Sequence, residues 1–264
     1  MSEPRVIAER LIDAPGVLYL TFSNPDAFNS VTVEMREELI RQFTEAEKDD
    51  SIRVIVLQGA GDRCFCSGLS MDMLVDMNSL EDRYIQWDVG KRCREAMEHS
   101  TKIVVAAVKG SCAGNGLEFV LCCDLVYCAD NTKFLLPEFN IGLTPGCGGA
   151  ISLHKHIPYH RFMEMVLFCD RMYPDEAKHY GFVNEIFALD DFDEEVKLRM
   201  IQLSKTAPLA VRGLKEQFRI QETLGFEAAY RKEMENSMKL MDSNDFKNAV
   251  MSFINKENPI FYGN

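Results

Sequence analysis

The stretch from Lys109 to Ala150 constrains the fold most, because it places two glycine-rich turns around a short apolar helix and a strand. Glycine is favoured where the backbone takes a positive φ or approaches another group closely. A glutamate stands beside each turn: Glu118 follows the first, and Glu138, twenty residues later, precedes the second. Both lie in mostly apolar surroundings, where a carboxylate is costly unless it is paired, hydrogen-bonded or used in chemistry.

Two interpretations of these acids are open from the residues alone. In the first, Glu118 is a first-turn helix acid that interacts favourably with the helix dipole, and Glu138 ends a strand and faces solvent. In the second, the two carboxyl groups converge on one site, where one donates a proton and the other accepts one.

The spacing of the glycines and acids resembles the crotonase (enoyl-CoA hydratase/isomerase) superfamily. The pattern is G-x-x-x-G-x-G-x-E, followed by P-E-x-x-x-G-x-x-P-G-x-G-G. Three further segments similar to that family occur in the same order: NPDAFNSV (24–31), VIVLQGAGDRCFCSG (54–68) and SNDFKNAVMSFINKENPIF (243–261). The resemblance therefore covers nearly the whole chain.

The order of apolar runs indicates an α/β protein that ends in helices. The chain has 264 residues, enough for one large domain or for one domain with a helical appendage. Runs of strand length at 54–58 and 103–108 favour parallel strands buried on both sides, and 59–70 is predicted to be a loop. Thr32 is predicted to cap a helix, residues 182–187 to form a strand, and the pattern beyond about residue 190 is nearly all helical.

What the resemblance implies for the architecture is more specific. It implies an α/β fold with a crotonase-like ββα spiral core at residues 1–190, which binds acyl-CoA and carries the catalytic groups. Residues 191–264 would form a C-terminal helical region that mediates trimerisation. The expected assembly is a homotrimer or a dimer of trimers.

Composition restricts the partners and the location. The net charge of −12 argues against a nucleic-acid or anionic-membrane surface, since both need a basic footprint. The charged N-terminal segment lacks the apolar core of a signal peptide, and no apolar run approaches the length of a membrane span. Nine cysteines scattered through apolar runs are expected to be reduced and buried, as in a cytoplasmic protein. Cys64 and Cys66 lack a second pair at ligand spacing, so no metal site is expected.

The resemblance also assigns the central chemistry. Family members bind acyl-CoA thioesters, and negative charge builds up on the thioester oxygen when water adds to the acyl chain or a proton leaves it. Two backbone N–H groups form an oxyanion hole for that charge. Matching the motifs places these donors at Leu69 and Asn115. Glu118 and Glu138 match both catalytic acids of enoyl-CoA hydratases, whereas similar isomerases commonly retain only the second. No separate cofactor is expected, because coenzyme A is part of the substrate.

Contacts with the substrate are implied at eight positions. These are Ala27, Phe28, Ser67, Leu69, Met71, Gly116, Phe253 and Lys256. The last two would come from a neighbouring subunit, and the structural alternative for them is a core phenylalanine and a solvated lysine. The methionines at 71, 73 and 77, with Trp87, could form a malleable acyl pocket or could simply belong to the core.

Some residues depart from the family pattern. Leu69 and Ser70 stand where the family often has alanine and aspartate, and Asn115 stands where glycine is common. Asn140 replaces a residue that is often aliphatic, and Glu257 replaces one that is often basic. These changes bear on the acyl group and on the phosphate contacts rather than on the two acids.

The sequence therefore predicts an enzyme, an enoyl-CoA hydratase-like lyase that adds water to a 2,3-unsaturated acyl-CoA, including cyclic or branched ones. One alternative is an enoyl-CoA isomerase, or a β-diketone-type C–C hydrolase acting on a cyclic CoA ester. An alternative of another class is a non-catalytic scaffold that binds CoA esters.

Overall fold

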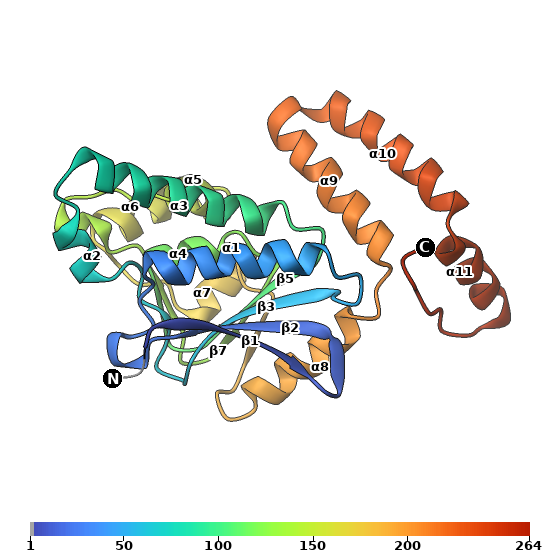
Figure 1. The fold of residues 1–264 in the computed structure, drawn as a ribbon, viewed down its shortest axis with the longest axis horizontal. Coiled ribbons are helices and arrows are strands. Elements are labelled where there is room, and N and C mark those ends of the chain that lie inside the picture. Colours follow the sequence, from blue (N-terminus) through green and yellow to red (C-terminus); the bar gives the residue numbers. More distant parts are fainter. Residues whose placement is uncertain (1–2) are drawn as a thin grey trace.

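The computed structural model describes residues 3–264 as two β-sheets with helices packed on them and a C-terminal run of helices (Figure 1). The larger sheet has six strands in the order β1-β2-β3-β5-β7-β9, and the smaller has three in the order β4-β6-β8. The strands of the larger sheet are β1 (Arg5–Leu11), β2 (Ala14–Ser23), β3 (Val54–Gly59), β5 (Ile103–Val108), β7 (Leu125–Ala129) and β9 (Glu185–Phe187). Those of the smaller sheet are β4 (Cys64–Cys66), β6 (Ser111–Ala113) and β8 (Lys133–Leu135). Only β1 and β2 pair antiparallel; the other neighbours within the described residues are parallel.

The helices follow the strands in the pattern that the sequence predicts. They are α1 (Val33–Glu47), α2 (Met71–Asp76), α3 (Leu80–Glu98), α4 (Asn115–Val120), α5 (Gly149–Leu153), α6 (Tyr159–Leu167), α7 (Pro174–His179), α8 (Phe192–Leu203), α9 (Pro208–Leu224), α10 (Phe226–Asp242) and α11 (Asn244–Asn255). Two 3₁₀ turns accompany them, η1 (Pro25–Ala27) and η2 (Glu138–Ile141). The predicted cap of α1 is confirmed, because the Thr32 side chain accepts a hydrogen bond of 3.3 Å from the Met35 amide.

Both faces of the larger sheet are covered. On one face, α1, α3 and α4 pack over a buried cluster in which Phe22 of β2 contacts Phe65 of β4 and Phe119 of α4, at ring-centroid distances of 5.6 and 5.4 Å. On the other face, α8 packs through Phe192 and its apolar neighbours. This core joins the two sheets to α4, the short helix that begins the candidate site.

Three short elements differ from the prediction. The segment 59–70 is not wholly a loop, because β4 lies within it, and β6 lies within the first glycine turn. Strand β9 is shorter than the predicted strand at 182–187. A strand of three residues shows no sequence period, and β4 and β6 pair only with segments distant in the chain, so local patterns did not reveal them.

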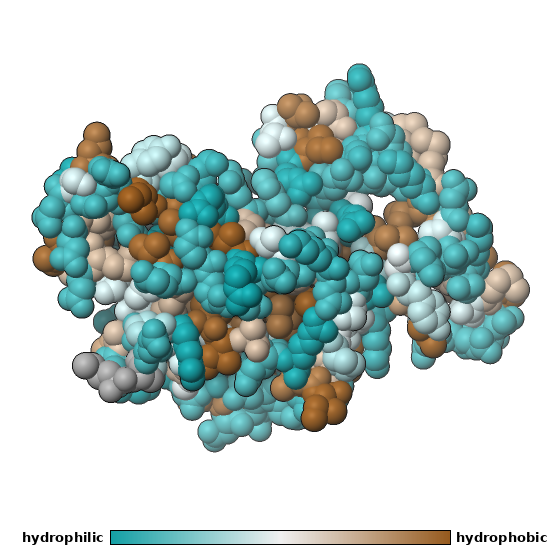
Figure 2. Space-filling model, viewed as in Figure 1, coloured by the Kyte–Doolittle hydropathy of each residue, from teal (hydrophilic) through white to brown (hydrophobic). Residues whose placement is uncertain are grey.

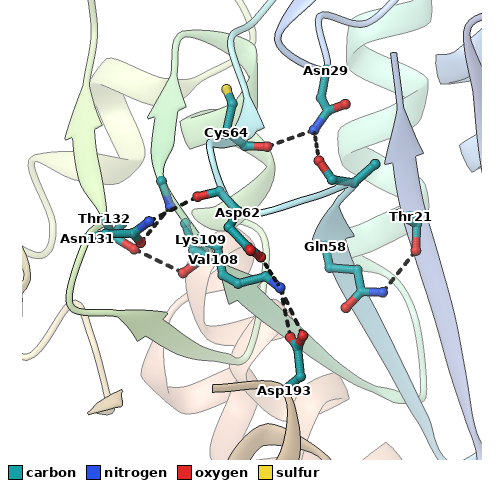
Figure 3. Close-up of polar contacts among 12 residues, drawn as sticks. Thr21, Asn29, Gln58, Asp62, Cys64, Val108, Lys109, Asn131, Thr132 and Asp193 are labelled. Carbon is teal, nitrogen blue, oxygen red and sulfur yellow. Dashed lines mark hydrogen bonds and ion pairs between the residues drawn. The ribbon is translucent and has the colours of Figure 1, made fainter. Parts of the chain in front are cut away.

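Polar contacts hold the loop before β4 and the turn before β6 (Figure 3). The Asn29 side chain donates to the carbonyl of Cys64 at 2.7 Å. Lys109, nearly buried, lies between the carboxylates of Asp62 and Asp193 at 2.8 and 2.9 Å. The first contact fixes the start of the small sheet, and the second ties the loop and the end of β5 to α8.

Beyond α8 the chain leaves the sheets. Helices α9 and α10 form an antiparallel hairpin, and α11 lies at the end of this C-terminal arm (Figure 1). Many large apolar side chains of the arm are exposed, and Figure 2 shows them among hydrophilic neighbours. They include Phe218, Phe226, Tyr230, Met234, Met238, Met251 and Phe253. No helix within residues 3–264 is both long and apolar enough to cross a membrane.

Candidate active site

Glu118 is held as a hydrogen-bond acceptor at the start of α4. The residue is 3% exposed. One carboxylate oxygen accepts hydrogen bonds from the amides of Cys147 and Gly149, at 2.8 and 2.9 Å. The other accepts from the Asn115 side-chain amide at 3.1 Å. Three N–H donors therefore meet this carboxylate, two of them from the second glycine turn.

Each glycine turn contains a glycine that makes room for the glutamate of the other turn. A Cβ added to Gly149 would lie 2.6 Å from Cγ of Glu118, too close for any real side chain. A Cβ added to Gly114, whose φ is +52°, would lie 3.0 Å from a carboxyl oxygen of Glu138. Gly149 is thus required by close approach, and Gly114 by its positive φ.

Glu138 lies at the start of η2, where its carboxyl group has fewer hydrogen-bond partners than that of Glu118. It is partly buried, and its Oε2 atom has no hydrogen-bond partner within the described part of the chain. The pKa of Glu138 is raised to about 7: burial is the main cause, the Glu138 backbone amide partly opposes the shift, and the negative charge of Glu118 adds to it. A carboxyl group with this pKa is present in both protonation states near neutral pH.

The amides of Leu69 and Asn115 lie on adjoining segments. A Cβ added to Gly68 would lie 3.3 Å from the Asn115 amide nitrogen, so the two segments touch. Hydrogen bonds of 2.9 and 3.2 Å to Val31 hold the backbone on both sides of Leu69. Within residues 3–264 neither amide has a protein acceptor, and Asn115 begins α4, where N–H groups lack helical partners.

A cavity of about 400 Å³ lies where these segments meet. It is lined by six of the predicted site residues: Ser67, Leu69, Met71, Asn115, Glu118 and Glu138. Its apolar wall includes Leu74, Met77, Trp87, Ile141 and Leu143. Met71, Met77 and Trp87 therefore line the cavity rather than a closed core, whereas Met73 does not line it.

The other predicted contact residues do not line this cavity. They are Ala27, Phe28, Gly116, Phe253 and Lys256. Gly116 has a packing role instead, because a Cβ there would lie 2.4 Å from the carbonyl oxygen of Cys66. Phe253 is 85% exposed on α11, so its alternative as a core residue is wrong within this chain.

Sequence reasoning missed Arg36, which also lines the cavity. Its side chain is buried and donates hydrogen bonds to the main-chain carbonyl of Gln86 at 3.3 Å and to the Gln86 side-chain oxygen. A signal for it exists: Arg36 begins the i, i+3, i+4, i+7 spacing of α1 that continues through Leu39, Ile40 and Phe43. A basic residue on the apolar face of a helix is expensive, which marks it for attention.

No group of three His, Cys, Asp or Glu side chains within residues 3–264 could hold a metal ion. All nine cysteines are free thiols, most of them buried, as predicted.

The two sheets, the glycine turns and the C-terminal helices together form the crotonase fold. The chain belongs to the enoyl-CoA hydratase/isomerase family, whose model matches residues 13–264. This confirms the resemblance at the level of family and fold, and members of this family bind acyl-CoA substrates.

Two kinds of relatives illustrate the match. The chain is 28% identical over 251 residues to a carnitinyl-CoA dehydratase of Proteus mirabilis, covering 94% of this chain and 95% of the relative. The fold superposes on that of an enoyl-CoA hydratase from Bacillus anthracis with a TM-score of 0.92, at 24% identity, covering 98% of this chain and 100% of that one. The match to an enoyl-CoA hydratase from Mycobacterium smegmatis has a TM-score of 0.90 at 25% identity, covering 98% and 100%.

Proposed function

We propose that this protein is an enoyl-CoA hydratase-like lyase that adds water to a 2,3-unsaturated acyl-CoA. One observation carries the proposal: two glutamates from separate glycine turns and two adjoining main-chain amides without protein acceptors line the same cavity. The relatives support the reaction class, because hydration and dehydration are the two directions of one reaction.

The amides of Leu69 and Asn115 would bind the thioester oxygen. When water attacks the β-carbon, negative charge moves to that oxygen, and a fixed N–H donor stabilises the charge more than it stabilises the neutral ester. Loss of one oxyanion-hole donor costs about 3 kcal/mol of activation free energy in other enzymes. Both donors belong to the main chain and are oriented before the substrate arrives.

The two glutamates would divide the proton transfers. Glu118, which accepts hydrogen bonds at both oxygens, would take a proton from the attacking water as its oxygen bonds to the β-carbon. Glu138, whose pKa is about 7, would give its proton to the α-carbon as the double bond is lost. The product gains one water, and a proton returns from Glu118 to Glu138 through solvent before the next turnover.

Replacing each acid with glutamine tests the assignment. In Glu118→Gln and Glu138→Gln, hydration should fall about 1,000-fold, within the usual contribution of acid–base groups. The measurement is the loss of absorbance of the conjugated enoyl thioester across straight, branched and cyclic esters, with a product mass increased by one water. Glu9→Gln, at an exposed position on β1, is the matched control. Near-wild-type hydration in either site variant would remove that residue from the mechanism.

The same assay separates the rival functions. An isomerase would move the double bond without a change in mass, and a C–C hydrolase would add water while opening a carbon ring. A non-catalytic scaffold would bind the esters tightly and turn over none of them.

We also propose that the chain divides functionally into a 1–190 core and a 191–264 region that assembles homotrimers or dimers of trimers. The support is the exposed apolar surface of the C-terminal arm and its separation from the sheets. Phe253 and Lys256, both outside the cavity of their own chain, would then reach the nucleotide of a neighbouring subunit's substrate. Met238→Asp, at an exposed position of α10, should convert the assembly to monomers in light scattering. An unchanged mass would exclude α10 from the interface.

A further inference from the structure

Arg36 is a buried cation at the wall of the cavity. It lies in the first turn of α1 and is 1% exposed. Its guanidinium group donates to the carbonyl of Gln86 at 3.3 Å, to the Gln86 side-chain oxygen, and to the carbonyl of Thr32 at 3.5 Å. Since a guanidinium group has five N–H donors, these contacts leave two without an acceptor within residues 3–264.

No carboxylate within residues 3–264 forms an ion pair with this cation. Other arginines are treated differently: Arg92 pairs with Glu37 and Asp88, although all three are far more exposed. A buried cation without a counterion is costly even when it is hydrogen-bonded, because neutral acceptors offset its charge less than a carboxylate does. An anionic group of a bound ligand would offset this cost.

The guanidinium group lies close to the reacting end of the cavity. A Cβ added to Gly90 would be 2.5 Å from the Cys147 sulfur and 3.6 Å from Nη1 of Arg36, so both groups face Gly90 of α3. The amide of the same Cys147 donates to Glu118. The positive charge is thus placed beside the segment that holds the catalytic carboxylate, where the acyl chain would lie.

We propose that Arg36 selects acyl-CoA substrates whose acyl chain ends in a carboxylate. This inference rests on the proposed function, and it names the substrate class of the same cavity. A carboxylate on the acyl chain would accept hydrogen bonds from the two remaining N–H groups, whose planar arrangement matches its two oxygens. It would also supply the missing counterion. The nearby charge of Glu118 opposes a second anion, so the preference depends on direct contact with Arg36. A cationic acyl group, such as the quaternary ammonium of a carnitinyl ester, would be repelled.

Matched pairs of esters test the proposal. Glutaconyl-CoA and fumaryl-CoA carry a terminal carboxylate, while pent-2-enoyl-CoA and crotonyl-CoA of the same lengths end in methyl groups. In the wild type, kcat/KM should be about 10- to 100-fold higher for the better carboxylated ester than for its neutral partner. Arg36→Met should abolish this ratio. Arg41→Met, on the same helix but exposed and paired with Glu38, should leave the ratio unchanged.

The outcomes separate this inference from the proposed function. Equal or better hydration of both neutral esters by the wild type would overturn the role of Arg36 while leaving the hydratase assignment in place. A ratio that survives in Arg36→Met would overturn it as well. If no ester is turned over, the hydratase assignment fails, and the Kd of each ester measured by calorimetry tests the role of Arg36. Tighter binding of the carboxylated esters that is lost in Arg36→Met supports this role. Equal binding of carboxylated and neutral esters contradicts it. Should Arg36→Met not fold, Arg36→Lys, which keeps the charge without the planar fork, should reduce the ratio by about tenfold.

Discussion

The segments that carry Glu118 and Glu138 use the same side chain in opposite ways. Glu118 lies in a fully buried helix and receives three N–H donors, two of them from the other segment. Glu138 lies in a 3₁₀ turn without a buried residue, and one of its oxygens has no partner within residues 3–264. The more deeply buried acid is the better satisfied one. The difference shows that donors, rather than burial alone, decide whether a carboxyl group is held as an acceptor or left to keep a proton.

After the replacements of the two acids themselves, the largest effect should come from removing the space that Glu118 occupies. In Gly149→Ala, the new methyl group would collide with Glu118 Cγ, so the carboxylate would lose its amide donors. We expect kcat/KM to fall about 100-fold, since small displacements of catalytic groups have effects of this size. Thermal unfolding should show a loss of about 1–3 kcal/mol from overpacking.

Gly146→Ala is the control for that variant. It lies in the same turn, and no protein atom lies within 4 Å of its added Cβ. Its stability should match the wild type. Equal behaviour of the two alanine variants would show that the turn does not confine Glu118.

The next effect concerns the proton on Glu138. Its pKa is about 7 in the folded protein against 4.5 ordinarily, so the folded state binds the proton more tightly than the unfolded state. The stability that this provides is fully present below about pH 4.5 and is lost as the pH rises through about 7. Between about pH 4 and pH 8, the wild type should lose about 2 kcal/mol more than Glu138→Gln, after allowance for solvent screening of a partly buried group. Denaturant titrations at several pH values measure it, and parallel curves for the two proteins would contradict the shift.

A smaller effect should follow from removing one donor to Glu118. Asn115→Ala deletes the side-chain amide and keeps the main-chain N–H in place. We expect a loss of about 1 kcal/mol, or about fivefold in kcat/KM, as for one hydrogen bond. A loss as large as that of Gly149→Ala would mean that the side chain, not the second turn, holds the carboxylate.

The smallest effect should come from Lys109, which anchors the first turn from outside the cavity. Its two aspartate partners are 61% and 74% exposed, so Lys109→Met should cost at most about 1 kcal/mol of unfolding free energy. The kcat/KM for an enoyl-CoA ester should stay within about twofold of the wild type. A large loss of activity would show that this ion pair, rather than the hydrogen-bonded backbone, orients α4.

The sequence could supply the family and the positions of both acids, because the glycine spacing around Glu118 and Glu138 is long and compound. It could not show that the two turns contact each other, with Gly149 packed against Glu118 and Gly114 against Glu138. Those contacts join segments that meet only in the folded chain. The raised pKa of Glu138 follows from its burial and from the nearby charge of Glu118, and neither is visible in a linear pattern.

Other parts were out of reach for different reasons. Strands β4 and β6 are too short to show a period. The sequence places Arg36 on the apolar face of α1, but only the folded structure shows that it lines the cavity. The assignment of Phe253 and Lys256 to a neighbouring subunit concerns a second copy of the chain and remains a prediction.

The main-chain amides of Leu69 and Asn115 allow their side chains to vary during evolution. An N–H group of the main chain survives every replacement except proline. Leucine and asparagine can therefore occupy these two positions while both main-chain donors are kept. Under the proposed function, side chains around the thioester can change without loss of the two N–H groups that would bind its oxygen.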